Sequence, residues 1–165
     1  MPLHDLLSRA RVAILDGHAI ETGAPGTGVS ALPRVLDAAA WLLADGGNTA
    51  SIALALRERE ARASTALGHG VALPHARVAG LDECRAAFLR LQHPVDSGAP
   101  DGEPVDLVLA LLVPEHEVSA QVQRLAEIAE RFANPDYRAA LREARDVGEL
   151  HGVLCGASDF LPCAA

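Results

Sequence analysis

The segment from Leu107 to Val113 is the longest unbroken apolar run in the chain. A short run without polar alternation is typical of a strand that is buried on both faces of a sheet. A membrane-spanning helix needs roughly 20 apolar residues, so this run does not predict one. The rest of the chain must therefore supply a layer for each face of that sheet.

Segments with helical periodicity alternate with shorter apolar segments along the chain. We expect helices over residues 3–10, 31–45, 48–60, 119–132, 134–141 and 146–154, and strands over residues 12–15, 71–73 and 86–91. Glycine and proline predict loops at 22–28 and 94–102. Strands interleaved with helices indicate an α/β fold. We expect a single domain over residues 1–156, followed by a C-terminal tail over 157–165.

Local signals mark the ends of several of these helices. Ser30 is expected to cap the helix over 31–45, and Gly46 and Gly47 to end it, because glycine readily adopts the left-handed conformation at helix ends. Two further helix starts are marked by Asn134 before Pro135 and by Asp146 with Glu149. The helix over 119–132 is expected to bury one apolar stripe, made of Val122, Leu125, Ala129 and Phe132.

Composition and charge narrow the functional class. The 165 residues suit one domain, and with only 3% aromatic residues the core is expected to consist of Ala, Leu and Val. The net charge of −8 argues against a nucleic-acid groove, which needs a basic face. The three cysteines lack CxxC spacing, which argues against a disulfide framework or a zinc ribbon. The N-terminus does not resemble a signal peptide, so we expect a cytoplasmic protein without membrane insertion.

The segment from Gly68 to Arg77, GHGVALPHAR, carries the strongest chemical signal. Pro74 holds the preceding residue extended and so fixes how His75 is presented. Gly68 and Gly70 allow a tight turn that brings N–H groups towards an anion. Imidazole is a nucleophile near neutral pH, because one ring nitrogen keeps a lone pair while the other holds a proton. These residues alone leave two interpretations open: phosphate handling by His75, or a turn histidine without chemistry.

A longer stretch, REARASTALGHGVALPH from Arg59 to His75, resembles the active-site signature of the type-2 enzyme IIA domains. These domains belong to the bacterial phosphoenolpyruvate-dependent sugar phosphotransferase system, and include fructose-type, mannitol-type and nitrogen-regulatory proteins. A second block, PVDLVLALLVP from Pro104 to Pro114, is similar to the same family at the matching distance downstream. The resemblance covers residues 30 to 154 and implies a mixed central sheet with helices on both faces.

The resemblance also implies a chemistry and a set of partners. It implies that His75 accepts a phosphoryl group from the phosphocarrier HPr or a paralogue, with no cofactor. It places Arg59 beside the phosphohistidine, where a guanidinium would present several donors to phosphate oxygens; without the resemblance, Arg59 is a solvated charge at a helix end. Further partners would be a IIB domain or regulated target proteins. Because the sequence shows no IIB domain or permease, we expect the nitrogen-regulatory branch, with a sugar-specific IIA component as the alternative.

The sequence does not decide the role of three positions in the site. Relatives often carry a second histidine seven residues after the proline that matches Pro114, and this chain has Gln121 there. Glutamine can donate an amide hydrogen bond to phosphate but cannot become cationic. Ser64 and Thr65 either offer hydroxyls to the phosphate or are simply strand residues.

A metal site is the remaining and least favoured interpretation. His69 and His75 could be imagined as a ligand pair, but no Asp, Glu or Cys lies between them to complete a site. We therefore expect no metal, and a metal-dependent hydrolase is the weakest of the alternatives.

Overall fold

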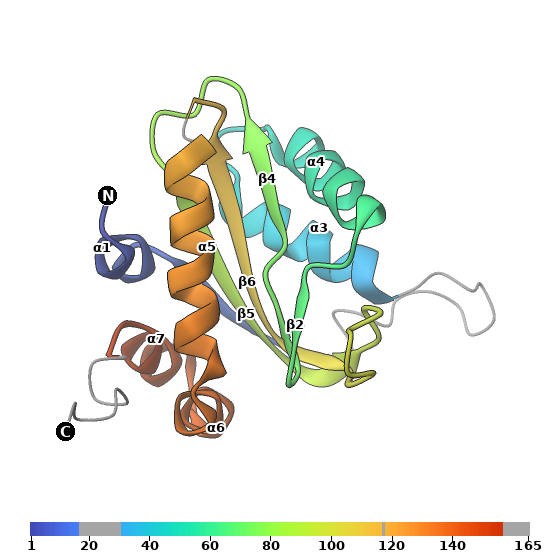
Figure 1. Ribbon diagram of the computed structural model, residues 1–165, viewed down its shortest axis with the longest axis vertical. Helices are drawn as coiled ribbons and strands as arrows, with labels where there is room; N and C mark the ends of the chain where they lie inside the picture. Colours follow the sequence, from blue (N-terminus) through green and yellow to red (C-terminus); the bar gives the residue numbers. More distant parts are fainter. Residues whose placement is uncertain (17–30, 117, 157–165) are drawn as a thin grey trace.

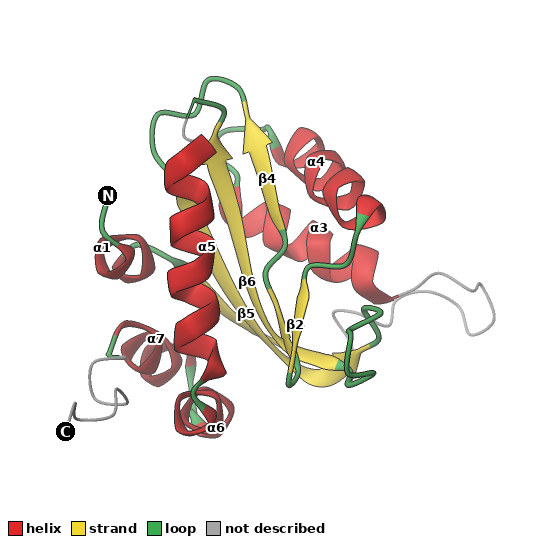
Figure 2. Cartoon of the chain, viewed as in Figure 1, coloured by secondary structure: helices red, strands yellow, loops and turns green. Residues whose placement is uncertain are grey.

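The computed structural model describes residues 1–16, 31–116 and 118–156, which form helices around a six-stranded sheet (Figure 2). The helices are α1 (Leu3–Ser8), α3 (Ala31–Leu43), α4 (Thr49–Arg62), α5 (Val118–Ala133), α6 (Pro135–Glu143) and α7 (Val147–Cys155). The strands are β1 (Arg11–Leu15), β2 (Ala66–Gly68), β3 (Val71–Ala72), β4 (His75–Val78), β5 (Arg85–Val95) and β6 (Val105–Pro114). The predicted loop at 22–28, the Ser30 cap and the tail at 157–165 lie outside the described residues.

The sheet is mixed, as predicted. Its strand order is β1-β5-β6-β3-β2, and β4 also pairs with β6. β6 is antiparallel to β5 but parallel to β3 and β4, while β1 is parallel to β5. β3 and β4 therefore lie one after the other along the same edge of β6, with Leu73 and Pro74 between them.

Both faces of β6 are buried, which confirms the prediction made from the apolar run. Helices α3 and α4 cover one face of the sheet, and α5, α1, α6 and α7 lie on the other (Figure 1). Val108, Ala110 and Leu112 belong to the core under α3 and α4. Leu107, Leu109, Leu111 and Val113 belong to the core on the opposite face. Alternate residues thus enter opposite cores, as the two-residue period of a strand requires.

The expected helix-end signals are present. The Asn134 side chain accepts hydrogen bonds from the backbone N–H groups of Asp136 and Tyr137. The Asp146 side chain accepts from the N–H of Glu149 at 2.8 Å. Gly46 and Gly47 follow α3 with φ of 61° and 95°, the conformation that glycine was expected to supply. No helix in the described part of the chain is both long and apolar enough to cross a membrane.

The apolar stripe predicted for α5 is wrong at Val122. This side chain is 66% exposed, whereas Gln121, Arg124 and Ile128 are buried. The buried face is therefore rotated by about one residue from the prediction. Polar side chains can occupy it because each has a partner: Gln121 bonds to Arg77 and Arg124 bonds to the Sγ of Cys84.

Several strand boundaries also differ from the prediction. β2 and β4 were not expected, because segments this short carry too little periodicity to be recognised. β5 continues to Val95, into the predicted loop at 94–102, and its end pairs with Val105 after a register shift. Helix α4 runs two residues beyond the predicted Glu60, to Arg62.

Candidate functional site

Strand β4 begins at His75 and fixes the direction of its side chain. The Pro74 carbonyl accepts a hydrogen bond from the N–H of Leu111 at 2.9 Å, and His75 then pairs with Leu111 in the sheet. Proline has no N–H to donate, so it separates β3 from β4 without leaving an unpaired donor. Ala76 points into the core while its neighbours His75 and Arg77 point outwards.

The hydrogen-bond partners of His75 define which ring nitrogen is the nucleophile. Nδ1 lies 2.8 Å from the carbonyl oxygen of Leu73, and Nε2 lies 3.3 Å from Nε of Arg59. A carbonyl only accepts and a guanidinium only donates, so the partners assign the proton to Nδ1 and the lone pair to Nε2. Partial burial lowers the pKa of His75, the Leu73 carbonyl opposes this effect, and the charge of Arg59 adds to it. These effects favour the neutral form of the imidazole.

Nε2 faces a cavity of about 330 Å³ with a basic lining. The lining consists of Ala55, Glu58, Arg59, Arg62, His75, Ala76, Arg77 and Gln121. Three arginines against one glutamate favour an anionic ligand. Arg59 is held in place by a second hydrogen bond, from its Nη1 to the Ala63 carbonyl at 3.0 Å. The predicted residues His75, Arg59 and Gln121 are thus brought together.

Ser64 and Thr65, predicted as phosphate ligands or strand residues, do not line this cavity. Both precede β2 rather than lie in it. The Ser64 hydroxyl donates to the Ser97 carbonyl at 2.9 Å, and the Thr65 hydroxyl and N–H both donate to the carboxylate of Glu60. Their donors are therefore used within the protein, which anchors the end of α4 to the start of β2.

Gly68 and Gly70, predicted to offer N–H groups to phosphate, also lie outside the cavity lining. Both have positive φ, 90° and 77°. A Cβ on Gly68 would lie 2.8 Å from Oδ2 of Asp101, and one on Gly70 would lie 2.6 Å from Oδ1 of Asp106. The glycines thus permit a tight turn packed against the segment that leads into β6. His69, between them, is exposed and adjoins Asp101 rather than His75.

Comparison with known proteins identifies the family. Residues 29–155 match the model of the phosphoenolpyruvate-dependent sugar phosphotransferase system EIIA 2 family. The chain belongs to this family. The match covers most of the described fold and confirms the resemblance on which the site residues were selected.

Individual EIIA relatives favour the nitrogen-regulatory branch. A nitrogen regulatory protein of Bradyrhizobium diazoefficiens is 38% identical over 109 residues, which cover 66% of this chain and 71% of that protein. Other nitrogen regulatory proteins match over about three fifths of their length. The crystal structure of the nitrogen regulatory protein IIA-Ntr from Neisseria meningitidis superimposes with a TM-score of 0.74 at 32% identity, covering 92% of this chain and 98% of that one. A fructose-specific EIIA component of Haloferax volcanii is 32% identical over 61% of this chain and 65% of its own.

The cavity of this EIIA domain also contains three charged residues that were not predicted as site residues: Arg62, Arg77 and Glu58. Arg77 follows His75 by two positions, so strand periodicity would have placed both on one face had β4 been predicted to begin at His75. Glu58 and Arg62 lie three and seven residues after Ala55 on α4, and this spacing places all three on one helix face.

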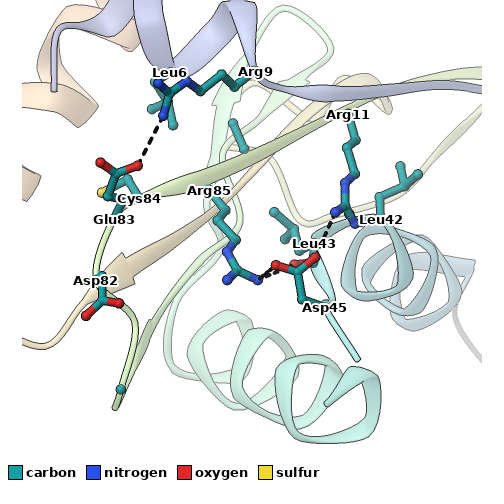
Figure 3. Close-up of a pocket in the computed structure, with 12 residues that line it drawn as sticks. Leu6, Arg9, Arg11, Leu42, Leu43, Asp45, Asp82, Glu83, Cys84 and Arg85 are labelled. Atoms are coloured by element: carbon teal, nitrogen blue, oxygen red, sulfur yellow. Dashed lines mark hydrogen bonds and ion pairs between the residues drawn. The ribbon is translucent and has the colours of Figure 1, made fainter. Parts of the chain in front are cut away.

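A larger cavity of this EIIA domain, about 420 Å³, also contains arginines but differs in its electrostatics (Figure 3). Arg9 pairs with Glu83, while Arg11 and Arg85 both pair with Asp45. Arg11 also donates to two carbonyls at the end of α3. These arginines neutralise acidic side chains and tie α1, β1 and α3 to β5, whereas the arginines around His75 outnumber the acids.

Proposed function

We propose that His75 accepts a phosphoryl group on Nε2 from HPr or a nitrogen-branch paralogue, and that the chain acts as a nitrogen-regulatory IIA protein. The observation that carries this proposal is the pair of contacts that leave the Nε2 lone pair facing an arginine-lined cavity. The similarity to nitrogen regulatory proteins supports the choice of branch.

The transfer balances without an added acid, base or metal. The Nε2 lone pair of His75 attacks the phosphorus of a phosphohistidine on the carrier and the P–N bond of the carrier breaks. The carrier's imidazole, already protonated on its other ring nitrogen, recovers the electron pair and leaves as the neutral ring. The proton on Nδ1 of His75 stays hydrogen-bonded to the Leu73 carbonyl, which stabilises the positive charge that the ring gains. Phosphoryl transfer of this kind depends mainly on alignment and charge stabilisation.

Arg59 has two successive roles in this scheme. Its Nε first donates to the Nε2 lone pair, which orients the ring. When the phosphoryl group arrives, that hydrogen bond is replaced by bonds from the guanidinium to phosphoryl oxygens. The bond to the Ala63 carbonyl keeps the guanidinium beside the ring during this exchange.

A labelling experiment tests the acceptor. Wild-type protein, His75→Ala and the exposed control His93→Ala are incubated with phosphoenolpyruvate, enzyme I and HPr, and in parallel with the nitrogen-branch paralogues. We expect acid-labile, base-stable phosphate on wild type and His93→Ala, and none on His75→Ala. Equal labelling of His75→Ala and wild type would show that the proposal is wrong.

The same assay separates the two branches. A nitrogen-regulatory protein is expected to be labelled faster by the nitrogen-branch donors and to keep its phosphate when a fructose- or mannitol-type IIB domain is added. The similarity to a fructose-specific component supports the alternative, in which the labelled protein passes its phosphate to such a IIB domain. Rapid loss of label to the IIB domain would favour sugar uptake.

A further inference from the structure

We propose that Arg77 is a second phosphate-binding arginine of the His75 site, and that the buried side chain of Gln121 positions it. This inference rests on the proposed function. It assigns a role to Arg77, which extends from the strand, and gives Gln121 a role in addition to binding phosphate.

The sheet register directs Arg77 towards the same space as His75. β4 pairs in parallel with β6, with His75 opposite Leu111 and Arg77 opposite Val113. Residues two apart on a strand point to the same face, and both side chains line the same cavity. The charge of Arg77 also lowers the pKa of His75, as expected of a cation close to the ring.

Gln121 fixes the orientation of this arginine. Its side chain is only 5% exposed, and its Oε1 accepts a hydrogen bond from Nε of Arg77 at 2.8 Å. Because Nε is bonded to the glutamine, the two Nη groups remain available to an anion in the cavity. A guanidinium held at Nε presents these groups as a fixed pair of donors, the arrangement that suits phosphate oxygens.

The same hydrogen bond also orients the amide of Gln121. A guanidinium only donates, so the amide oxygen must face Arg77 and the amide nitrogen must point away from it. Among the groups that the structure describes, none accepts a hydrogen bond from this Nε2. Gln121 lines the cavity and therefore offers an additional donor to a phosphoryl oxygen.

The arrangement surrounds the phosphoryl group from two sides. Arg59 extends from α4, while Arg77 extends from β4 and is held by Gln121 from α5. A phosphoryl group on Nε2 of His75 would thus meet guanidinium groups from two separate elements. Since glutamine cannot take up a proton near neutral pH, the second side of the site keeps the same charge and the same donors across that range.

The test uses Arg77→Gln, Arg77→Lys and Gln121→Met, with Arg9→Gln as the matched control. Arg9 is an exposed arginine paired with Glu83 in the other cavity, so its replacement removes one positive charge without touching the His75 site. Two phosphoryl donors are compared: the phosphorylated carrier protein, and phosphoramidate, a small molecule that reacts without forming a protein–protein interface. Circular dichroism and urea unfolding establish that each variant is folded.

With phosphoramidate, we expect Arg77→Gln to label about tenfold more slowly than Arg9→Gln, with Arg77→Lys in between. Gln121→Met is expected to slow labelling in the same direction. Adding Arg77→Gln to Gln121→Met should then slow labelling by much less than tenfold, because the arginine has already lost its positioning contact. With the carrier protein, kcat should fall while KM changes little. Should Gln121→Met fail to fold, Gln121→Glu keeps an oxygen for Arg77 and removes the amide donor, and slower labelling is again expected.

Two results would overturn the proposal. If Arg77→Gln and Arg9→Gln label at equal rates with phosphoramidate, Arg77 does not contact the phosphoryl group. If Arg77→Gln raises only the KM for the carrier protein, Arg77 is a docking residue. Both results require that wild type is labelled on His75, so they are distinct from a failure of the proposed function, in which wild type itself stays unlabelled.

Discussion

Replacing Gly70 by alanine tests whether this glycine serves the turn or the phosphate. The Gly70 carbonyl accepts hydrogen bonds from the N–H groups of Asp106 and Leu107, and its φ of 77° lies in the left-handed region. An added Cβ would lie 2.5 Å from an Nη atom of Arg142 and 2.6 Å from Oδ1 of Asp106. These two side chains form a bidentate ion pair, with N···O distances of 2.7 and 2.8 Å, which the new methyl group would force apart.

The expected destabilisation has two parts. An L-residue in the left-handed region costs about 1–2 kcal/mol, partly offset by the lower entropy of the unfolded alanine chain, which leaves about 1 kcal/mol. Separating the ion pair adds about 1.5 kcal/mol, the lower end of the range for charged hydrogen bonds, because Arg142 is partly exposed. Gly80 has nearly the same φ, 73°, with open space around its Cβ position, so Gly80→Ala is the matched control for the first part alone.

Urea unfolding of the two variants measures the difference. We expect Gly70→Ala to be less stable than Gly80→Ala by about 1.5 kcal/mol, which for a chain of this size is about 3–6 °C in Tm. In an Arg142→Gln background the difference should shrink, because the ion pair is already lost. Equal stability of the two variants would refute the packing argument. A Gly70→Ala protein of unchanged stability that is no longer labelled would instead show that Gly70 binds phosphate.

Two further predictions follow from the titrating groups. The NMR titration of His75 should have a midpoint below 6.5, because burial and then the charge of Arg59 lower its pKa. Arg59→Gln should move this midpoint upwards. A wild-type midpoint of 6.5 or above would contradict the described environment. Since the unfolded chain takes up this proton first, His75 should also reduce folding stability as the pH falls from about 6.5 towards that midpoint. Burial raises the pKa of Tyr137, the only tyrosine, to about 12, so phenolate absorbance should appear near pH 10 only in unfolded protein. At pH 7, Tyr137→Phe should be about 1 kcal/mol less stable than wild type, because it lacks the hydrogen bond to the Leu154 carbonyl. As the pH rises from 10 to 12, wild type should lose stability that Tyr137→Phe does not lose, because only the unfolded wild-type chain gives up the phenol proton there. Parallel curves of stability against pH would refute this.

The fold could be predicted largely because the strongest sequence signal, the long apolar run, marks the central strand of the sheet. The apolar run from Leu107 to Val113 requires two covering layers, and the amphipathic segments on either side of it supply them. Long periodic elements with clear caps were predicted to within a few residues, as Asn134 and Asp146 illustrate. The mixed strand directions came from the family resemblance, since spacing alone indicates alternation of elements but not their orientation.

The parts of the site that escaped prediction are those that depend on tertiary contacts. β4 is a strand because it pairs with β6, and its four residues are too few for their polar–apolar alternation to predict a strand. Without that strand, nothing in the sequence relates Arg77 to His75. The stripe predicted for α5 was wrong for the same reason. Glutamine and arginine are buried only where a hydrogen-bonding partner is available, and the partner of Gln121 is Arg77 itself.

The wrong stripe predicted for α5 and the unpredicted strand β4 therefore have the same cause, the contact between Arg77 and Gln121. A buried glutamine is tolerable only if its amide oxygen is satisfied, and β4 supplies the donor by starting at His75 and carrying Arg77 two residues later. The backbone between β3 and β4 supplies the other half of the site, because the Leu73 carbonyl holds Nδ1 of the histidine. Pro74 links these two effects: it ends one pairing segment and begins the next. The identity of residue 74 thus bears on the tautomer of His75 and on the position of Arg77 together.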